Sequence, residues 1–205
     1  VTDRSRTILA ALACAVILLT GSPAAQIGVI VMGALFGDLF CDLPPQEGQL
    51  PVASPGNARS TGVAAALFCI LLVASLLPIS PAPSLRGLAA SFYRAGALVF
   101  GGGHVVLPLL ETSLVGPGWI DRSTFLAGYG AAQAVPRPMF SVAAFLGAEV
   151  AAGPSARVGA ATALLAVFLP GFLLLIAVLP IWSRLHAAPS ARRAIAGVGA
   201  AVVGL

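Results

Sequence analysis

The chain has 205 residues, of which 59% are hydrophobic and 9% charged, and its mean hydropathy is +1.00. This composition excludes an ordinary soluble domain, in which about 25% of residues are charged. All 11 basic residues are arginines, and the formal net charge is +4. Because the arginines are scattered and no basic patch has interleaved aromatic residues, we interpret them as determinants of membrane topology and exclude a nucleic-acid surface.

The first apolar stretch, Ile8 to Phe40, is interrupted at Gly21-Ser22-Pro23. As a helix it would measure about 50 Å, which is more than one hydrocarbon thickness and less than two. One kinked crossing and two short crossings both fit. A loop rich in proline and glycine follows from Cys41 to Ser60, as in a solvated connector. We therefore expect a membrane-spanning connector with an exposed loop over residues 1–60 and a transmembrane domain over residues 61–205.

Two later segments are long and apolar enough to span a bilayer. Thr61 to Ile79 is the first, and a cluster of prolines ends it. Val158 to Trp182 is the second, with Pro170-Gly171 as the expected position of a kink. Between them, Ser84 to Arg94 contains two arginines and no acidic residue, and we expect a short amphipathic helix along the membrane surface.

The arginine distribution predicts an orientation. The segments Pro81–Arg94 and Ser183–Arg193 carry arginines without acidic residues, so we expect both in the cytoplasm. Both spanning segments would then run inward, and the intervening chain would cross an odd number of times. A new apolar run begins near Ala194 and continues to Leu205, and we expect the chain to be a piece of a longer protein.

Three consecutive glycines, Gly101, Gly102 and Gly103, precede His104. Glycine in a helix interior is unfavourable by about 1 kcal/mol per residue, so we predict a helix break here. A break at membrane depth is tolerated only where the backbone is buried in protein or faces a water-filled cavity. Two interpretations remain open. The opened amides form an anion site with His104 as a further donor, or the glycines only let helices pack closely.

A second break is predicted at Pro136-Arg137-Pro138. The segments on either side, Thr124 to Val135 and Met139 to Ala151, are each too short to cross alone, and paired half-membrane helices are a transporter device. Gly128 allows close approach, and Gln133 offers a donor and an acceptor.

Arg137 is unusual because a guanidinium in so apolar a segment is costly. Its side chain either binds a transported anion, pairs with Glu149 or Glu111, or extends from a helix end to the interface.

Several stretches of this region have a distinctive pattern: Phe100-Gly-Gly-Gly-His-Val-Val-Leu-Pro-Leu-Leu, then Gly118-Trp-Ile, Phe125-Leu-Ala-Gly-Tyr-Gly-Ala-Ala-Gln-Ala-Val-Pro and Phe168-Leu-Pro-Gly-Phe. Together they closely resemble the C-terminal half of the chromate transporter family, over about residues 86–186. The resemblance implies an all-α, polytopic transmembrane helical bundle with broken, half-membrane helices. It further implies that residues 61–205 form one half of an inverted-repeat transporter, whose homologous N-terminal half lies in the same protein or in a second subunit.

The function implied by the resemblance is a secondary transporter that expels chromate, a divalent oxyanion, across the inner (plasma) membrane. We expect the substrate site to combine both breaks and nearby arginines: Arg94, Gly101, Gly102, Gly103, His104, Gly128, Gln133, Pro136, Arg137 and Pro138. Arg137 departs from the family, which typically has Pro-Gly-Pro here. The arginine can block the site, strengthen anion binding or lie at the rim.

Three other functions were weighed. A sulfate-type anion transporter is one, because sulfate and chromate share charge and tetrahedral shape. A non-transporting membrane scaffold or degenerate half-subunit is another. A membrane enzyme is the least favoured, because the sequence has no paired-carboxylate motif, nucleophile elbow, metal-ligand spacing or dinucleotide loop. We therefore expect no catalytic residues, no metal and no cofactor, with the oxyanion and the lipid bilayer as partners.

Overall fold

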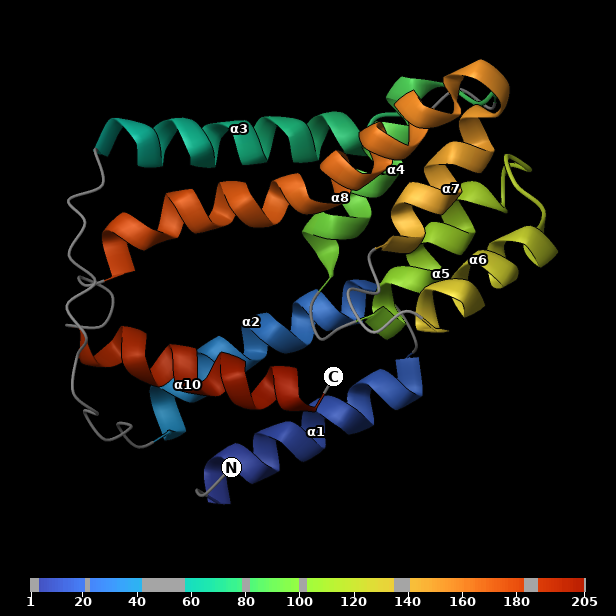
Figure 1. Cartoon of the computed structure of the whole chain (residues 1–205). Coiled ribbons are helices and arrows are strands. Elements are labelled where there is room, and N and C mark those ends of the chain that lie inside the picture. Colours follow the sequence, from blue (N-terminus) through green and yellow to red (C-terminus); the bar gives the residue numbers. More distant parts are fainter. Residues whose placement is uncertain are drawn as a thin grey trace. The chain divides into compact units, whose positions relative to one another are not determined.

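The computed structural model describes residues 4–20, 23–41, 58–78, 82–99, 103–134, 141–182 and 188–204. All regular structure in these residues is helical, which confirms the predicted all-α class (Figure 1). The helices form two compact units. The first unit comprises Val1–Ala58 with Val178–Leu205, and the second comprises Arg59–Ala177.

The first unit contains the N-terminal helices and the C-terminal helix. Its elements are α1 (Arg4–Thr20), α2 (Pro23–Phe40), the short 3-10 helix η2 (Leu179–Ile181) and α10 (Pro189–Val203). The apolar N-terminal stretch therefore forms two helices of 17 and 18 residues, each about 26 Å long. They run in opposite directions (Figure 1). Of the two alternatives that the sequence left open, the structure therefore has two short helices and not one kinked helix.

Small residues hold α10 against α2. A Cβ added at Gly197 would lie 2.1 Å from the carbonyl oxygen of Gly33, and one added at Gly37 would lie 2.7 Å from the Cα of Gly197. Helices approach this closely only where side chains are absent, as in membrane bundles. An ion pair between Arg193 and Asp38, with Nε and Oδ1 3.6 Å apart, joins the same two helices.

Among the described residues, two helices are long and apolar enough to cross a membrane, and both lie in the second unit: α3 (Ala58–Leu76) and α8 (Ala156–Val178). Pro170 lies inside α8, as the sequence predicted for a spanning helix. The two helices run antiparallel (Figure 1). The chain therefore leaves α3 and α8 at opposite ends of the unit, and the prediction that both spans run inward is wrong.

The other helices of this unit are short. They are α4 (Leu85–Leu98), α5 (Gly103–Leu114), α6 (Arg122–Ala134) and α7 (Ser141–Ala151), with the 3-10 turn η1 (Gly153–Ser155) before α8. The four α-helices have 11 to 14 residues, or about 16–21 Å each, which is less than the hydrocarbon core of about 30 Å. Half-membrane helices were predicted for Thr124–Val135 and Met139–Ala151, and α6 and α7 have such lengths.

α4 lies in the core of the second unit. Leu88 and Phe92 are fully buried, and Ser84 caps the helix by accepting a hydrogen bond from the Gly87 N–H at 3.1 Å. The sequence predicted an amphipathic helix on the membrane surface. The helix is confirmed, but its apolar face packs against protein, because α5 and α7 contact it.

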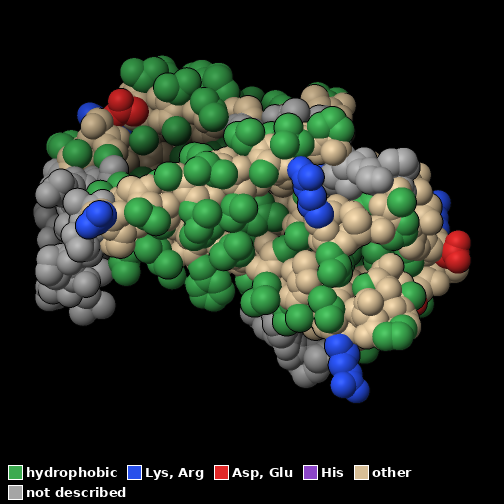
Figure 2. All heavy atoms as spheres, turned by 90° about the horizontal axis from the view of Figure 1, so that it is seen from above, with side chains coloured by type: hydrophobic (Ala, Val, Ile, Leu, Met, Phe, Trp, Pro, Cys, Tyr) green, Lys and Arg blue, Asp and Glu red, His purple; other side chains and the backbone are tan. Residues whose placement is uncertain are grey.

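Large hydrophobic side chains remain exposed on the two long helices. On α3 they include Val63, Ile70 and Val73, and on α8 they include Leu165 and Phe172. Figure 2 shows hydrophobic side chains spread over much of the drawn face, with few charged side chains among them. Such surfaces suit contact with lipid or with further transmembrane helices.

Candidate functional site

The first predicted break lies between α4 and α5. α4 ends at Leu98, Val99 is extended (φ −80°, ψ 107°), and α5 begins at Gly103, so the helix break is confirmed. Gly101 and Gly102 lie outside the described residues, and only the backbone of Gly103 and His104 is described. The first N–H groups of α5 have no acceptor within the helix, and they give its N-terminus a partial positive charge.

Proline within α5 adds an acceptor to this first turn. Pro108 lies inside the helix and has no N–H to bond the carbonyl of His104, four residues before it. Thr112 Oγ1 donates a hydrogen bond to the Pro108 carbonyl at 2.7 Å. The start of α5 therefore has backbone N–H groups without an acceptor in the helix, and its His104 carbonyl lacks the usual donor four residues on.

The helix before the break is held firmly on two sides. A Cβ added at Gly96 would lie 2.1 Å from the carbonyl oxygen of Val167 in α8. On α3, the Phe68 carbonyl accepts a hydrogen bond from the Tyr93 hydroxyl at 3.1 Å. The end of α4 is therefore fixed relative to both long helices of its unit.

Arg94 is a cation one turn before this break. It lies four residues before the end of α4 and is half-buried. Among the residues that the structure describes, Arg94 has no ion-pair partner, and the sequence contains no acidic residue between Glu47 and Glu111. A partly desolvated guanidinium without a counter-charge attracts an anion.

The second break lies between α6, which ends at Ala134, and α7, which begins at Ser141. Pro136, Arg137 and Pro138 lie outside the described residues.

Two candidate residues of α6 have local partners. Gly128 is buried, and a Cβ added there would lie 2.3 Å from Cδ1 of Phe145 in α7, so the close approach at Gly128 is between helices. Gln133 is exposed, and its Nε2 donates a hydrogen bond to the Tyr129 hydroxyl. Tyr129 was not among the expected site residues, although its spacing of four from Gln133 places the two on one helix face.

Glu111 was one of two acids considered as a partner for Arg137. Its Oε1 lies 3.0 Å from Nε of Arg122, which joins α5 to α6. Glu149, the other acid, is exposed on α7. Glu111 therefore already has a cationic partner, Arg122, at the connection between α5 and α6.

The two breaks belong to the same unit. α4 contacts α5, α6 contacts α7, and the two pairs meet where α4 contacts α7. In Figure 1, the end of α4 and the start of α5 point to the same side of this unit as the end of α6 and the start of α7. Two pairs of half-membrane helices therefore open toward one side.

Comparison with known proteins places this arrangement in a family. Residues 86–205 match the family described as "Chromate transporter". The chain is 38% identical over 119 residues to a chromate transport protein of Pseudomonas aeruginosa, covering 57% of this chain and 27% of that protein. It is 32% identical over 123 residues to a chromate transport protein of Cupriavidus metallidurans, covering 60% and 30%.

The match therefore spans less than a third of the length of these two relatives. No solved structure matches the chain significantly. The family match covers α4 through α10, which includes both helix breaks and more than half of the chain. On this basis, the chain belongs to the chromate transporter family.

Proposed function

We propose that this chain forms part of a secondary transporter that carries chromate out of the cell across the inner membrane. The observation that supports this most strongly is the pair of broken helices in one unit, α4–α5 and α6–α7, whose breaks open toward one side. Interrupted helices at membrane depth are the recurring architecture of ion-binding sites in secondary transporters. The chromate transport proteins of P. aeruginosa and C. metallidurans support chromate as the substrate.

The chemistry of the proposed site suits a divalent oxyanion. A tetrahedral oxyanion that leaves water needs hydrogen-bond donors and positive charge in return. The N-terminal N–H groups of α5, beginning at Gly103, offer such donors. In this proposal His104 is a further donor, and Arg94 and Arg137 supply positive potential. Gly101, Gly102, Pro136 and Pro138 belong to the proposed site as residues that disfavour a continuous helix. Gly128 lets α6 pack against Phe145 of α7, and Gln133 offers a donor and an acceptor.

Backbone amides recognise charge and shape, so sulfate is expected to compete with chromate. The homologous half that completes the path lies in the same protein or in a second subunit, because the chain matches less than a third of each relative named above. The unit bounded by α3 and α8, with short helices between them, is one repeat of this assembly in the proposal.

The test is chromate flux through the full-length protein in vesicles. Inside-out vesicles should accumulate radiolabelled chromate, and sulfate should inhibit competitively. His104→Ala and Arg137→Gly should each raise the KM for chromate, whereas Arg157→Gln, which removes an exposed arginine at the start of α8, should leave it unchanged.

Two results would contradict the proposal. Transport indifferent to both site substitutions would reject the site. A folded protein without flux would favour a membrane scaffold. If Arg137→Gly instead speeds transport, Arg137 obstructs the path and does not bind the anion.

A further inference from the structure

A hollow lies in the second unit between the end of α3, the start of α4 and the middle of α8. It has a larger part of about 230 Å³ and a smaller part of about 90 Å³. Three residues line both parts: Ala74, Arg86 and Ala90. The hollow extends along α4 from its N-cap Ser84 to Tyr93, and no described residue of α5, α6 or α7 lines it. It is therefore separate from the two helix breaks.

The larger part presents a mainly apolar surface. Its walls include Leu71 of α3, Ala89 of α4 and Leu169 of α8. Besides Arg86, two hydroxyl side chains line it, and both already donate hydrogen bonds: Ser75 to the Leu72 carbonyl at 2.7 Å and Tyr93 to the Phe68 carbonyl at 3.1 Å. Apart from the guanidinium, the walls therefore suit hydrocarbon better than water or a free ion.

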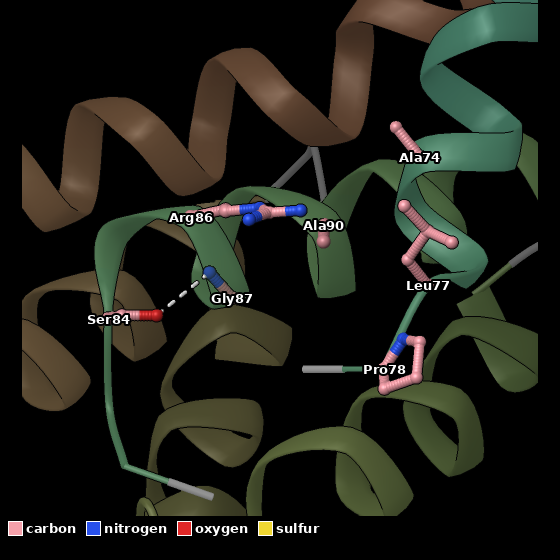
Figure 3. A pocket seen from close by; sticks show the side chains of 7 residues that line it. All are labelled: Ala74, Leu77, Pro78, Ser84, Arg86, Gly87 and Ala90. Atoms are coloured by element: carbon pink, nitrogen blue, oxygen red, sulfur yellow. Dashed lines mark hydrogen bonds between the residues drawn. The ribbon is translucent and has the colours of Figure 1, made fainter. Parts of the chain in front are cut away.

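The smaller part has a cation beside the end of α3, a helix that is long and apolar enough to span a membrane. Figure 3 shows the Arg86 side chain extending from the start of α4 toward Ala90, with Leu77 and Pro78 on the opposite wall of this part. The apolar window of α3 ends at Leu76, so a bilayer spanned by α3 would have its lipid headgroups at the level of this guanidinium.

Arg86 is exposed, and it makes no ion pair with any residue in the described ranges. The absence of acidic residues between Glu47 and Glu111 leaves the local charge positive along this part of the chain. A cation at headgroup depth, above an apolar hollow between spanning helices, is complementary to an anionic amphiphile.

We propose that this hollow binds an anionic phospholipid, with an acyl chain between α3, α4 and α8 and the phosphate on Arg86. The planar guanidinium can donate two parallel hydrogen bonds to one phosphate group. A zwitterionic lipid carries the same phosphate, but its own cation offsets the charge. The site therefore prefers phosphatidylglycerol to phosphatidylcholine, and a bound lipid fixes the start of α4 against the two long helices.

The test is native mass spectrometry of the full chain in detergent, titrated with phosphatidylglycerol or phosphatidylcholine of identical acyl chains. We expect the first bound lipid to show about a five-fold preference for phosphatidylglycerol, the size expected for one basic residue at a membrane surface. Arg86→Gln should abolish the preference, and Arg86→Lys should retain part of it. The matched control Arg157→Gln removes an exposed arginine outside the hollow and should retain all of it.

A second variant tests the apolar part. Ala90→Leu places additional side-chain atoms in the hollow and should lower the binding of both lipids by a similar factor. Equal binding of the two lipids by the unmodified chain would overturn the proposal, as would an unchanged preference in Arg86→Gln. Displacement of phosphatidylglycerol by sulfate beyond the effect of sodium chloride at equal ionic strength would assign Arg86 to a soluble oxyanion, and would also overturn it.

Discussion

Gly96 gives the sharpest test of how the first break is positioned. It lies two residues before the end of α4, and a Cβ added there would lie 2.1 Å from the Val167 carbonyl oxygen and 3.1 Å from Cγ of Pro170. Carbon and oxygen atoms that are not bonded stay more than about 3 Å apart, so Gly96→Ala must separate α4 from α8 by about 1 Å. The obstructing atom belongs to the backbone, and no rotamer change relieves it.

The expected cost follows from a matched comparison with Gly62→Ala in α3. No described atom outside the local helix lies within 4 Å of a Cβ added at Gly62. Alanine is more favourable than glycine in a helix by about 1 kcal/mol, and this gain is common to both variants. The free energy of unfolding of Gly96→Ala should therefore be lower than that of Gly62→Ala by about 1–3 kcal/mol, the usual range for overpacking.

The assay is unfolding of the full chain by dodecyl sulfate in mixed micelles, followed by far-ultraviolet circular dichroism. Chromate flux of Gly96→Ala should also fall, because the displaced helix carries Arg94 and leads into the break. Equal stability of the two variants would show that α4 does not contact α8 at Gly96, and the account of how the break is positioned would then be wrong.

Three substitutions test other contacts in the same assay. Gly159→Val should destabilise the second unit by about 1–3 kcal/mol, since a Cβ there would already lie 2.1 Å from a backbone oxygen of α7; an unchanged unfolding midpoint would disprove that contact. Tyr93→Phe should lower stability by about 0.5–1.5 kcal/mol through loss of the hydrogen bond to Phe68, and a neutral result would mean that this bond is absent in the membrane. Asp38→Asn should cost about 0.2–1 kcal/mol, because its partner Arg193 lies 3.6 Å away and both side chains are partly exposed; a larger loss would indicate a desolvated pair.

Local chemistry made the positions of the helix ends predictable. Three glycines before His104 disfavour a continuous helix, and α4 and α5 are separate helices. The interruption at Gly21-Ser22-Pro23 likewise separates α1 from α2, with Pro23 opening the second helix, the position at which a missing N–H costs least. Such signals depend on the residues at the break itself and on no distant contact.

Packing partners were not predictable in the same way. The glycines at positions 33, 37 and 197 allow close approach, but nothing in their spacing identifies α10 as the helix that packs on α2. Gly128 was expected to admit a substrate, yet the ring of Phe145 lies against it. A missing side chain makes room, and only the three-dimensional arrangement determines what fills that room.

The orientation prediction was wrong for a related reason. The excess of arginines was counted separately for the segments around Arg86 and Arg184, and each segment resembles a cytoplasmic one. α3 and α8 are nevertheless antiparallel (Figure 1), so the count cannot hold for both. Arg86 lines a hollow within the second unit. The rule that arginines accumulate on the cytoplasmic side is less informative for an arginine that lines such a hollow.

The most direct test of the central claim is the concentration dependence of chromate flux for Arg94→Gln beside Arg157→Gln in vesicles. If the break after α4 binds the oxyanion, Arg94→Gln removes a charged partner worth about 1.5–3 kcal/mol, and the KM should rise at least about ten-fold. Arg157→Gln, which changes the net charge equally, should leave the KM unchanged. Equal KM values for the two variants would contradict the assignment of the first break as the oxyanion site.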